Sequence, residues 1–220
     1  MASDLSRIRN NPLLDFSGVE LKQGGVLLDA DFNELVAVVD RRLRATASDV
    51  LGRSTVSSTT PDAFKIELQG NGLRIGRGRM YVDGLLAECH GGPAADAAQK
   101  QFDPLLAEVQ FPNPLTYATQ PFWLQPAPLP TAGSHLIYLD VWEREVTHIE
   151  RPELVETAVG VETSSRKQTV WQVRVLAEGA GTSDCGSDDA SVPGWAAVTA
   201  PSAARLNTGT HDAPPGNNDP

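Results

Sequence analysis

The sequence is poor in the residues that hold metals or build disulfide frameworks. Its 220 residues include two cysteines and four histidines. Cys89 and Cys185 lie far apart, without the density of a secreted disulfide scaffold or the paired spacing of a zinc site. We interpret them as two free thiols made in a reducing compartment, with a structural disulfide as the alternative.

Long apolar runs and a basic patch are also missing. No run approaches the roughly 20 apolar residues of a membrane-spanning helix, and residues 1–9 lack the apolar segment of a signal peptide. The formal net charge of -10 disfavours nucleic acid and anionic lipid surfaces. The nearest candidate for a basic patch has the spacing of a solvated strand edge, and it consists of Arg74, Arg77 and Arg79. We expect a soluble protein made in the cytoplasm, with no nucleic-acid partner and no membrane insertion.

No constellation of side chains is typical of an enzyme. Paired carboxylates can hydrolyse glycosides, but the solvated face of an acidic protein produces such residues by composition alone. Cys89 and His90 are neighbours in a predicted strand and point to opposite faces, so they do not form a nucleophile-base pair. The sequence also contains no phosphate-binding glycine loop and no nucleophile elbow. The histidines, which lack ligand spacing, are His90, His135, His148 and His211. We predict no catalytic residue, no metal and no cofactor.

The N-terminal region combines an arm with a helix. Residues 1–28 are predicted to form an extended docking arm, because Pro12 and Gly18 break helices and Gly24-Gly25 favours a turn. Residues 29–53 are predicted to contain an amphipathic helix that ends near Gly52. Asp31 with Glu34 three residues later resembles a capping box at its start.

Apolar residues of this helix recur at alternating steps of four and three, with only Thr46 interrupting the series. That spacing forms a heptad-like seam, which is typical of a short coiled coil and equally of an amphipathic helix on its own domain. Periodicity does not separate these alternatives. The seam, our candidate oligomer interface, consists of Phe32, Val36, Val39, Leu43 and Val50.

Residues 54–200 are predicted to form a mostly antiparallel β domain after a Ser/Thr-rich linker at 54–61. Asp83-Gly84 between two apolar strands indicates a type I′ hairpin. Further strands are expected at 64–68, 73–75, 136–146 and 170–176, with a short helix beginning at Pro152. The predicted fold class is therefore α+β.

A proline-rich loop is expected at residues 104–134. Its seven prolines exclude a central strand or a long helix. Its aromatic residues indicate a loop packed on a surface, and they are Phe111, Tyr117, Phe122 and Trp123. Trp123 with Tyr138 and Trp142 forms a candidate partner or glycan surface, because aromatic rings provide a stacking platform.

Several motifs together resemble a family of phage-tail-associated proteins found with contractile injection systems and phage-tail-like particles. The most specific is Gln-Gly-Gly-Val-Leu-Leu-Asp-Ala-Asp-Phe-Asn-Glu at residues 23–34, and the others span residues 16–19, 78–84, 138–147 and 169–175. The resemblance implies a structural particle component that anchors a fibre or decorates the baseplate. By analogy with tail fibres it favours a homotrimer bound to baseplate or other tail proteins.

The resemblance also concerns the end of the sequence. Residues 201–220 are rich in Pro, Gly and Asn and are expected to be a flexible tail. In members of that family the motif at residues 206–212 resembles the middle of a longer protein, which implies a further C-terminal region. The alternative function is a carbohydrate-binding or receptor-binding module of such a particle.

Overall fold

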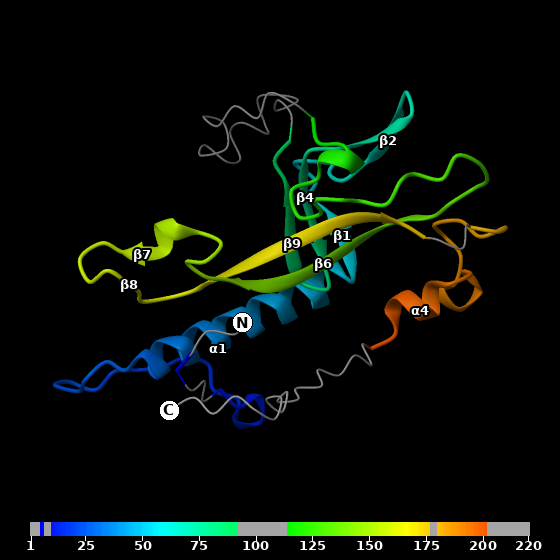
Figure 1. The fold of residues 1–220 in the computed structure, drawn as a ribbon. Coiled ribbons are helices and arrows are strands. Elements are labelled where there is room, and N and C mark those ends of the chain that lie inside the picture. The colour runs from blue at the N-terminus through cyan, green and yellow to red at the C-terminus, as the bar shows by residue number, and fades with distance from the viewer. Residues whose placement is uncertain (1–4, 7–9, 92–113, 177–179, 202–220) are drawn as a thin grey trace, which may run out of the picture. The chain divides into compact units, whose positions relative to one another are not determined.

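Helix α1 (Asp29–Leu51) precedes several small antiparallel sheets, so the predicted α+β class is confirmed (Figure 1). The computed structural model describes residues 5–6, 10–91, 114–176 and 180–201. Its two compact units are residues 1–131 with 137–175, and residues 132–136 with 176–220. Helix α1 and the named strands all belong to the first unit.

Helix α1 lies within the predicted range 29–53 and ends where the sequence predicts. Gly52 follows its last turn with a φ of 78°, and its N–H donates to the Ser48 carbonyl at 2.9 Å. The predicted capping box is wrong, because the N-cap is Leu28 and makes no side-chain cap bond. Asp29 and Asp31 lie in the first turn instead, where negative charge interacts favourably with the helix dipole.

A three-stranded sheet contains the predicted Asp83-Gly84 hairpin. Its strands lie in the order β1 (Ser54–Val56), β4 (Gly78–Val82) and β5 (Leu85–Cys89). The φ angles of 45° at Asp83 and 78° at Gly84 confirm a turn with positive φ at both central residues. The prediction of a linker from residue 54 is wrong for its first three residues, because Ser54–Val56 pairs with β4.

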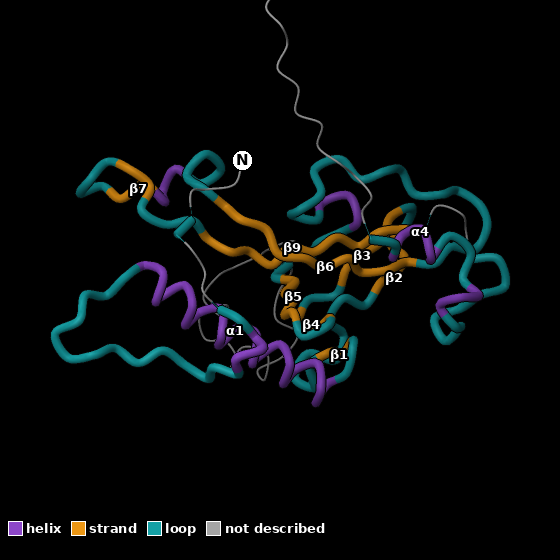
Figure 2. Tube along the Cα trace, turned by 90° about the horizontal axis from the view of Figure 1, so that it is seen from below, coloured by secondary structure: helices purple, strands orange, loops and turns teal. Residues whose placement is uncertain are grey.

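The longest strands form a two-stranded ribbon. β6 (Ile137–Val146) pairs antiparallel with β9 (Arg166–Val175) over ten residues each. Figures 1 and 2 show this ribbon crossing the β4–β5 hairpin rather than extending its sheet. β6 matches the prediction, whereas β9 begins four residues before the predicted Val170.

The connection between β6 and β9 differs from the short helix predicted there. Only one 3-10 turn, η3 (Pro152–Leu154), is helical, and β7 (Val155–Glu156) then pairs with β8 (Val161–Glu162). The valines at both strands favour extended backbone, and Gly160 has the positive φ of 71° at the turn.

A small hairpin and the loop that follows the undescribed residues complete the core of the first unit. β2 (Ile66–Gln69) pairs with β3 (Gly72–Ile75), and Ile75 is buried. In the described part of the proline-rich loop, η2 (Tyr117–Thr119) places Tyr117 in the core, as the packed-loop prediction requires. Phe111 of the predicted loop lies outside the described residues.

Trp171 occupies the centre of the core, where the ribbon meets β5. Its ring makes edge-to-face contacts with Phe64 at 5.0 Å and Phe122 at 6.1 Å between centroids. Its indole N–H donates to the Glu88 carbonyl at 2.8 Å, which joins β9 to β5. The buried Trp171 therefore connects the two sheets by both packing and a hydrogen bond.

The second unit has little regular structure among its described residues. It contains η4 (Asp189–Ser191) and the short helix α4 (Trp195–Thr199). The N–H of Leu176 donates to the Leu136 carbonyl at 2.8 Å. Across the described parts of both units, no helix has the length and apolar character needed to cross a membrane.

Candidate functional site

The predicted seam of α1 is exposed along its whole length. Its side chains range from 44% exposed at Val36 and Val39 to 75% at Val50, with Phe32 and Leu43 in between. Ala30 and Val38, on the opposite side of the helix, are buried, and Val38 is only 2% exposed. The helix therefore buries Ala30 and Val38 and leaves the five seam side chains exposed to solvent.

Beside the seam, a four-membered ion cluster holds α1 to β6 and β9. Arg44 forms ion pairs with Asp40 at 3.1 Å and with Glu143 of β6. Lys167 of β9 reaches both acids, at 3.4 Å from Asp40 and 3.3 Å from Glu143. Burial opposes the charge of Arg44, but the hydrogen bonds to Glu143 and Asp40 outweigh it and raise the pKa of the guanidinium.

A glycine lets the helix backbone approach the β4–β5 turn. A Cβ at Gly84 would lie 2.5 Å from the carbonyl oxygen of Arg44. Gly84 thus serves both the positive φ of the turn and the contact with α1. Together with the ion cluster, this contact fixes which face of α1 is covered and which remains exposed.

The arm preceding α1 is also apolar and exposed in its described part. Asn11 caps the turn η1 (Pro12–Leu14), and Gly24 has the positive φ of the predicted Gly-Gly turn. Ser6 accepts a hydrogen bond from the Asn33 side chain at 2.9 Å, so the chain returns beside α1. The exposed large apolar residues in the described part of the arm are Leu5, Leu13, Leu14, Phe16, Leu21, Val26, Leu27 and Leu28.

The candidate aromatic surface is only partly available. Tyr138 and Trp142 lie on the same face of β6, and Trp142 is 36% exposed. The ring of Trp123 is covered by the Arg174 guanidinium at 5.1 Å from its centroid, and it contacts Tyr117 edge-to-face. Trp142 is therefore the most accessible of the three predicted rings.

Several acidic side chains of β6 and of the connection that follows it are engaged in ion pairs. Asp140 pairs with Arg174 at 3.2 Å, and Glu150 pairs with Arg144 at 2.8 Å. Glu162 binds both the ring and the backbone N–H of His148 at 2.8 Å, and these hydrogen bonds lower the pKa of the carboxyl. Within the described ranges, no group of three or more His, Cys, Asp or Glu side chains could hold a metal ion.

The comparison with family models identifies relatives of almost the whole chain. Residues 1–208 match the model of DUF6519, a family of unknown function. The chain belongs to this family. No curated protein and no solved structure matches it. The DUF6519 match includes the arm, α1 and the strands of all four described sheets, so these elements lie in the region that defines the family.

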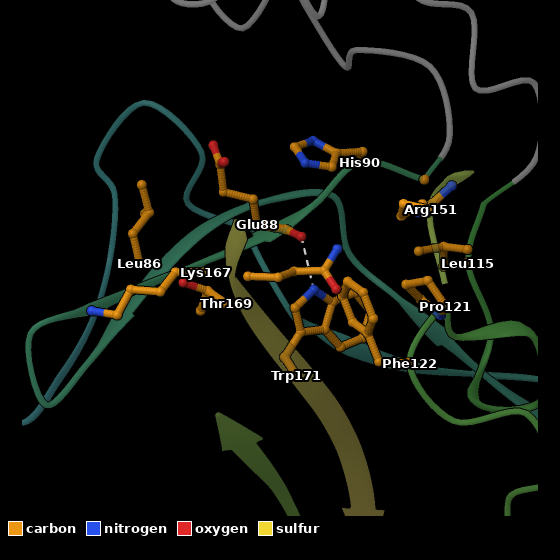
Figure 3. A pocket seen from close by; sticks show the side chains of 12 residues that line it. Leu86, Glu88, His90, Leu115, Pro121, Phe122, Arg151, Lys167, Thr169 and Trp171 are labelled. Carbon is orange, nitrogen blue, oxygen red and sulfur yellow. Dashed lines mark hydrogen bonds between the residues drawn. The ribbon is translucent and has the colours of Figure 1, made fainter. Parts of the chain in front are cut away.

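Two adjoining clefts in this DUF6519 chain escaped prediction. One, of about 560 Å³, lies beside α1 and is lined by Leu43, Val50 and Leu85 among others. The other, of about 750 Å³, lies between β5 and β9 around Trp171 and Phe122 (Figure 3). Their linings come from segments far apart in the sequence, so no local pattern could have predicted them.

Proposed function

We propose that this DUF6519 protein is a structural component of a phage-tail-like contractile injection particle. It anchors a fibre or decorates the baseplate through its arm and α1, and it self-associates, with a homotrimer favoured. One observation supports this most strongly: α1 leaves its five seam side chains exposed although the ion cluster beside them already holds the helix on the protein. Exposed apolar surfaces of this kind are typical of protein-protein contacts.

The free energies of burial and association explain why an arm accompanies the seam. Complete burial of a large apolar side chain contributes about 1.5–3 kcal/mol, so burying the remaining exposed part of each seam residue contributes about 1 kcal/mol. Five such residues give about 5 kcal/mol, while association costs about 4–15 kcal/mol. The seam alone is therefore marginal, and the apolar residues of the arm supply the additional contact with a neighbouring subunit.

The particle context rests on the resemblance of the motif at residues 23–34 to phage-tail-associated proteins. That motif joins the end of the arm to the first turn of α1. An exposed apolar segment followed by an exposed apolar helix face suits a protein that is permanently embedded among neighbours. The acidic net charge of -10 is compatible with protein partners and disfavours direct contact with nucleic acid.

Particle incorporation provides the direct test. We expect deletion of residues 1–28 to abolish co-sedimentation of the protein with assembled particles, while circular dichroism shows that the β strands still form. The control replaces Glu20 and Lys22, two polar residues of the arm, with alanine and should leave incorporation unchanged. Normal incorporation of the deletion variant would contradict the proposal.

A carbohydrate-binding or receptor-binding module is the second candidate. The exposure of Trp142 beside Tyr138 on one face of β6 favours it, since an accessible indole can stack on a sugar ring. Binding of the protein to a glycan array would support this function if the Trp142→Ala variant loses the binding and the Leu124→Ala variant keeps it. Leu124 is a suitable control because it is 93% exposed and lies outside the aromatic surface.

A further inference from the structure

Helix α1 contributes no side chain to the apolar core that the described residues form. That core surrounds Trp171 and includes residues of β3, β5, η2 and β9, together with Ala63 and Phe64. The buried residues of α1 are Ala30 and Val38, and neither belongs to this core. Helix α1 is therefore not attached to the sheets through the packing that stabilises them.

A cleft lies beside α1, where a helix usually packs its apolar side chains on a sheet. Leu43 and Val50 of the helix and Leu85 and Leu86 of β5 line this space of about 560 Å³. None of these four residues belongs to the core. Burial of an apolar face is what holds most helices in a folded protein. Separation of α1 from the β4–β5 hairpin would therefore remove little apolar contact.

The ion cluster joins α1 to the ribbon instead. Arg44 binds Glu143 of β6, and Asp40 binds Lys167 of β9 at 3.4 Å. These side chains are between 24% and 59% exposed, so dissolved ions can reach them. Salt screens exposed charges, because the Debye length falls from about 30 Å at 0.01 M to about 3 Å at 1 M ionic strength. The strength of this attachment therefore depends on ionic strength.

A glycine at the end of α1 provides a pivot. Gly52 has a φ of 78° and a ψ of -169°, a backbone conformation that is accessible essentially to glycine alone. The chain is fixed again immediately beyond it, because the Arg53 carbonyl accepts the Asp83 N–H at 2.8 Å and Ser54 begins the pairing of β1 with β4. A rotation of α1 therefore needs backbone changes at one or two residues and leaves the strands in place.

The close contact between α1 and Gly84 lies near this pivot. Arg44, whose carbonyl oxygen meets Gly84, is eight residues from Gly52, or about 12 Å along the helix. Asp29 in the first turn is 23 residues from Gly52, or about 34 Å. A rotation that moves the first turn by about 10 Å therefore moves Arg44 by only about 4 Å. The Gly84 contact constrains the distant end of the helix much less than the end beside Gly52.

We propose that the ion cluster is a salt-sensitive lock that keeps α1 against the ribbon. When its ion pairs are broken, α1 turns about Gly52 as a rigid helix while the strands stay folded. The rotation carries the arm with it and widens the cleft, which makes Leu85 and Leu86 accessible to a binding partner. This inference concerns a single chain and goes beyond the proposed function, because it holds whether or not the α1 seams self-associate.

Double electron–electron resonance on the full-length chain tests the lock directly. Spin labels are attached at Arg41→Cys on α1 and Leu68→Cys on β2, two exposed positions, in a chain that carries Cys185→Ser. Cys89 is buried and stays unlabelled. Labelled chains are diluted with unlabelled chains, so that only distances within one chain are measured.

The expected result is a second distance that appears as salt rises from about 0.05 M to about 1 M. It should differ from the first by at least about 5 Å, because Arg41 lies about 16 Å from Gly52 and a rotation of about 20° displaces it by that amount. Circular dichroism should show the same helix content at both salt concentrations, since the helix rotates without unfolding.

Removal of the two acids from the cluster provides a second test without added salt. We expect the variant with Asp40→Asn and Glu143→Gln to show the second distance at about 0.05 M salt. The matched control is Glu150→Gln, which removes the ion pair with Arg144 at 2.8 Å on the ribbon and leaves α1 untouched. This control should keep the original distance.

Two results would overturn the inference. One is an unchanged distance, either in about 1 M salt or in the variant without the two acids. The other is a loss of helical signal together with the change in distance, because α1 would then unfold rather than rotate. Should the double variant fail to fold, the salt titration of the chain with both acids decides. Light scattering measures self-association separately, so failure of the lock leaves the proposed function intact, and a monomeric mass leaves the lock intact.

Discussion

The side-chain amide of Gln120 completes the edge of β9 at Val173. Its Oε1 accepts the Val173 N–H at 2.7 Å, and its Nε2 donates to the Val173 carbonyl at 3.1 Å. The same Nε2 also donates to the Tyr117 carbonyl at 2.9 Å, and Gln120 is only 3% exposed. One buried amide therefore takes the place of a neighbouring strand at Val173.

Replacing Gln120 should destabilise the first unit strongly. Gln120→Leu leaves the buried N–H and C=O of Val173 without these partners, which costs about 2–4 kcal/mol for the two groups. Denaturant-induced unfolding measures this loss. Gln125→Leu is the matched control, because Gln125 is exposed in the same loop and its replacement should change stability by less than about 0.5 kcal/mol. Equal stability of the two variants would contradict the role of Gln120.

The contact of Gly84 with α1 predicts a difference between two glycine substitutions. Gly84→Ala combines unfavourable positive φ with a Cβ 2.5 Å from the Arg44 carbonyl oxygen, so it should displace α1. Gly160→Ala has similar φ strain but no atom within 4 Å of the new Cβ. We expect Gly160→Ala to cost about 1 kcal/mol and Gly84→Ala at least twice that. Thermal unfolding of both variants measures the difference, and equal losses would contradict the contact.

The two cysteines should differ in reactivity. Burial raises the pKa of the Cys89 thiol to about 11, so almost none of it is thiolate at pH 8. Cys185 is exposed. Alkylation at pH 8 followed by mass spectrometry should therefore add one label to the native protein and two after unfolding. With Cys185→Ser, rapid labelling of the native protein would show that Cys89 is accessible after all.

Local signals in the sequence predicted the elements that depend on neighbouring residues. The steps of four and three from Phe32 to Val50 predicted α1, Gly52 predicted its end, and Asp83-Gly84 predicted the hairpin. In each case the conformation depends on residues within one or two turns of the chain. The capping box was the exception, because the helix begins before Asp31 and makes no use of the predicted cap.

Contacts between distant segments could not be predicted in this way. Gln120 and Val173 are 53 positions apart, and Trp171 and Glu88 are 83 positions apart. The two clefts depend on where β5 and β9 cross, which no residue pattern in either strand specifies. The period of the seam was visible in the sequence, but its exposure depends on how the ion pairs of Arg44 with Glu143 and of Asp40 with Lys167 place α1.

The most direct test of self-association through α1 is the solution mass of the protein by light scattering across a range of concentrations. We predict that the wild type has three times the chain mass of 23.5 kDa and that Val39→Asp with Leu43→Asp gives a folded monomer. Arg41→Asp is the control, because it changes the charge equally at an exposed position away from the seam and should remain a trimer. A wild-type monomer at high concentration, or a trimer that survives both seam substitutions, would contradict the role of the seam.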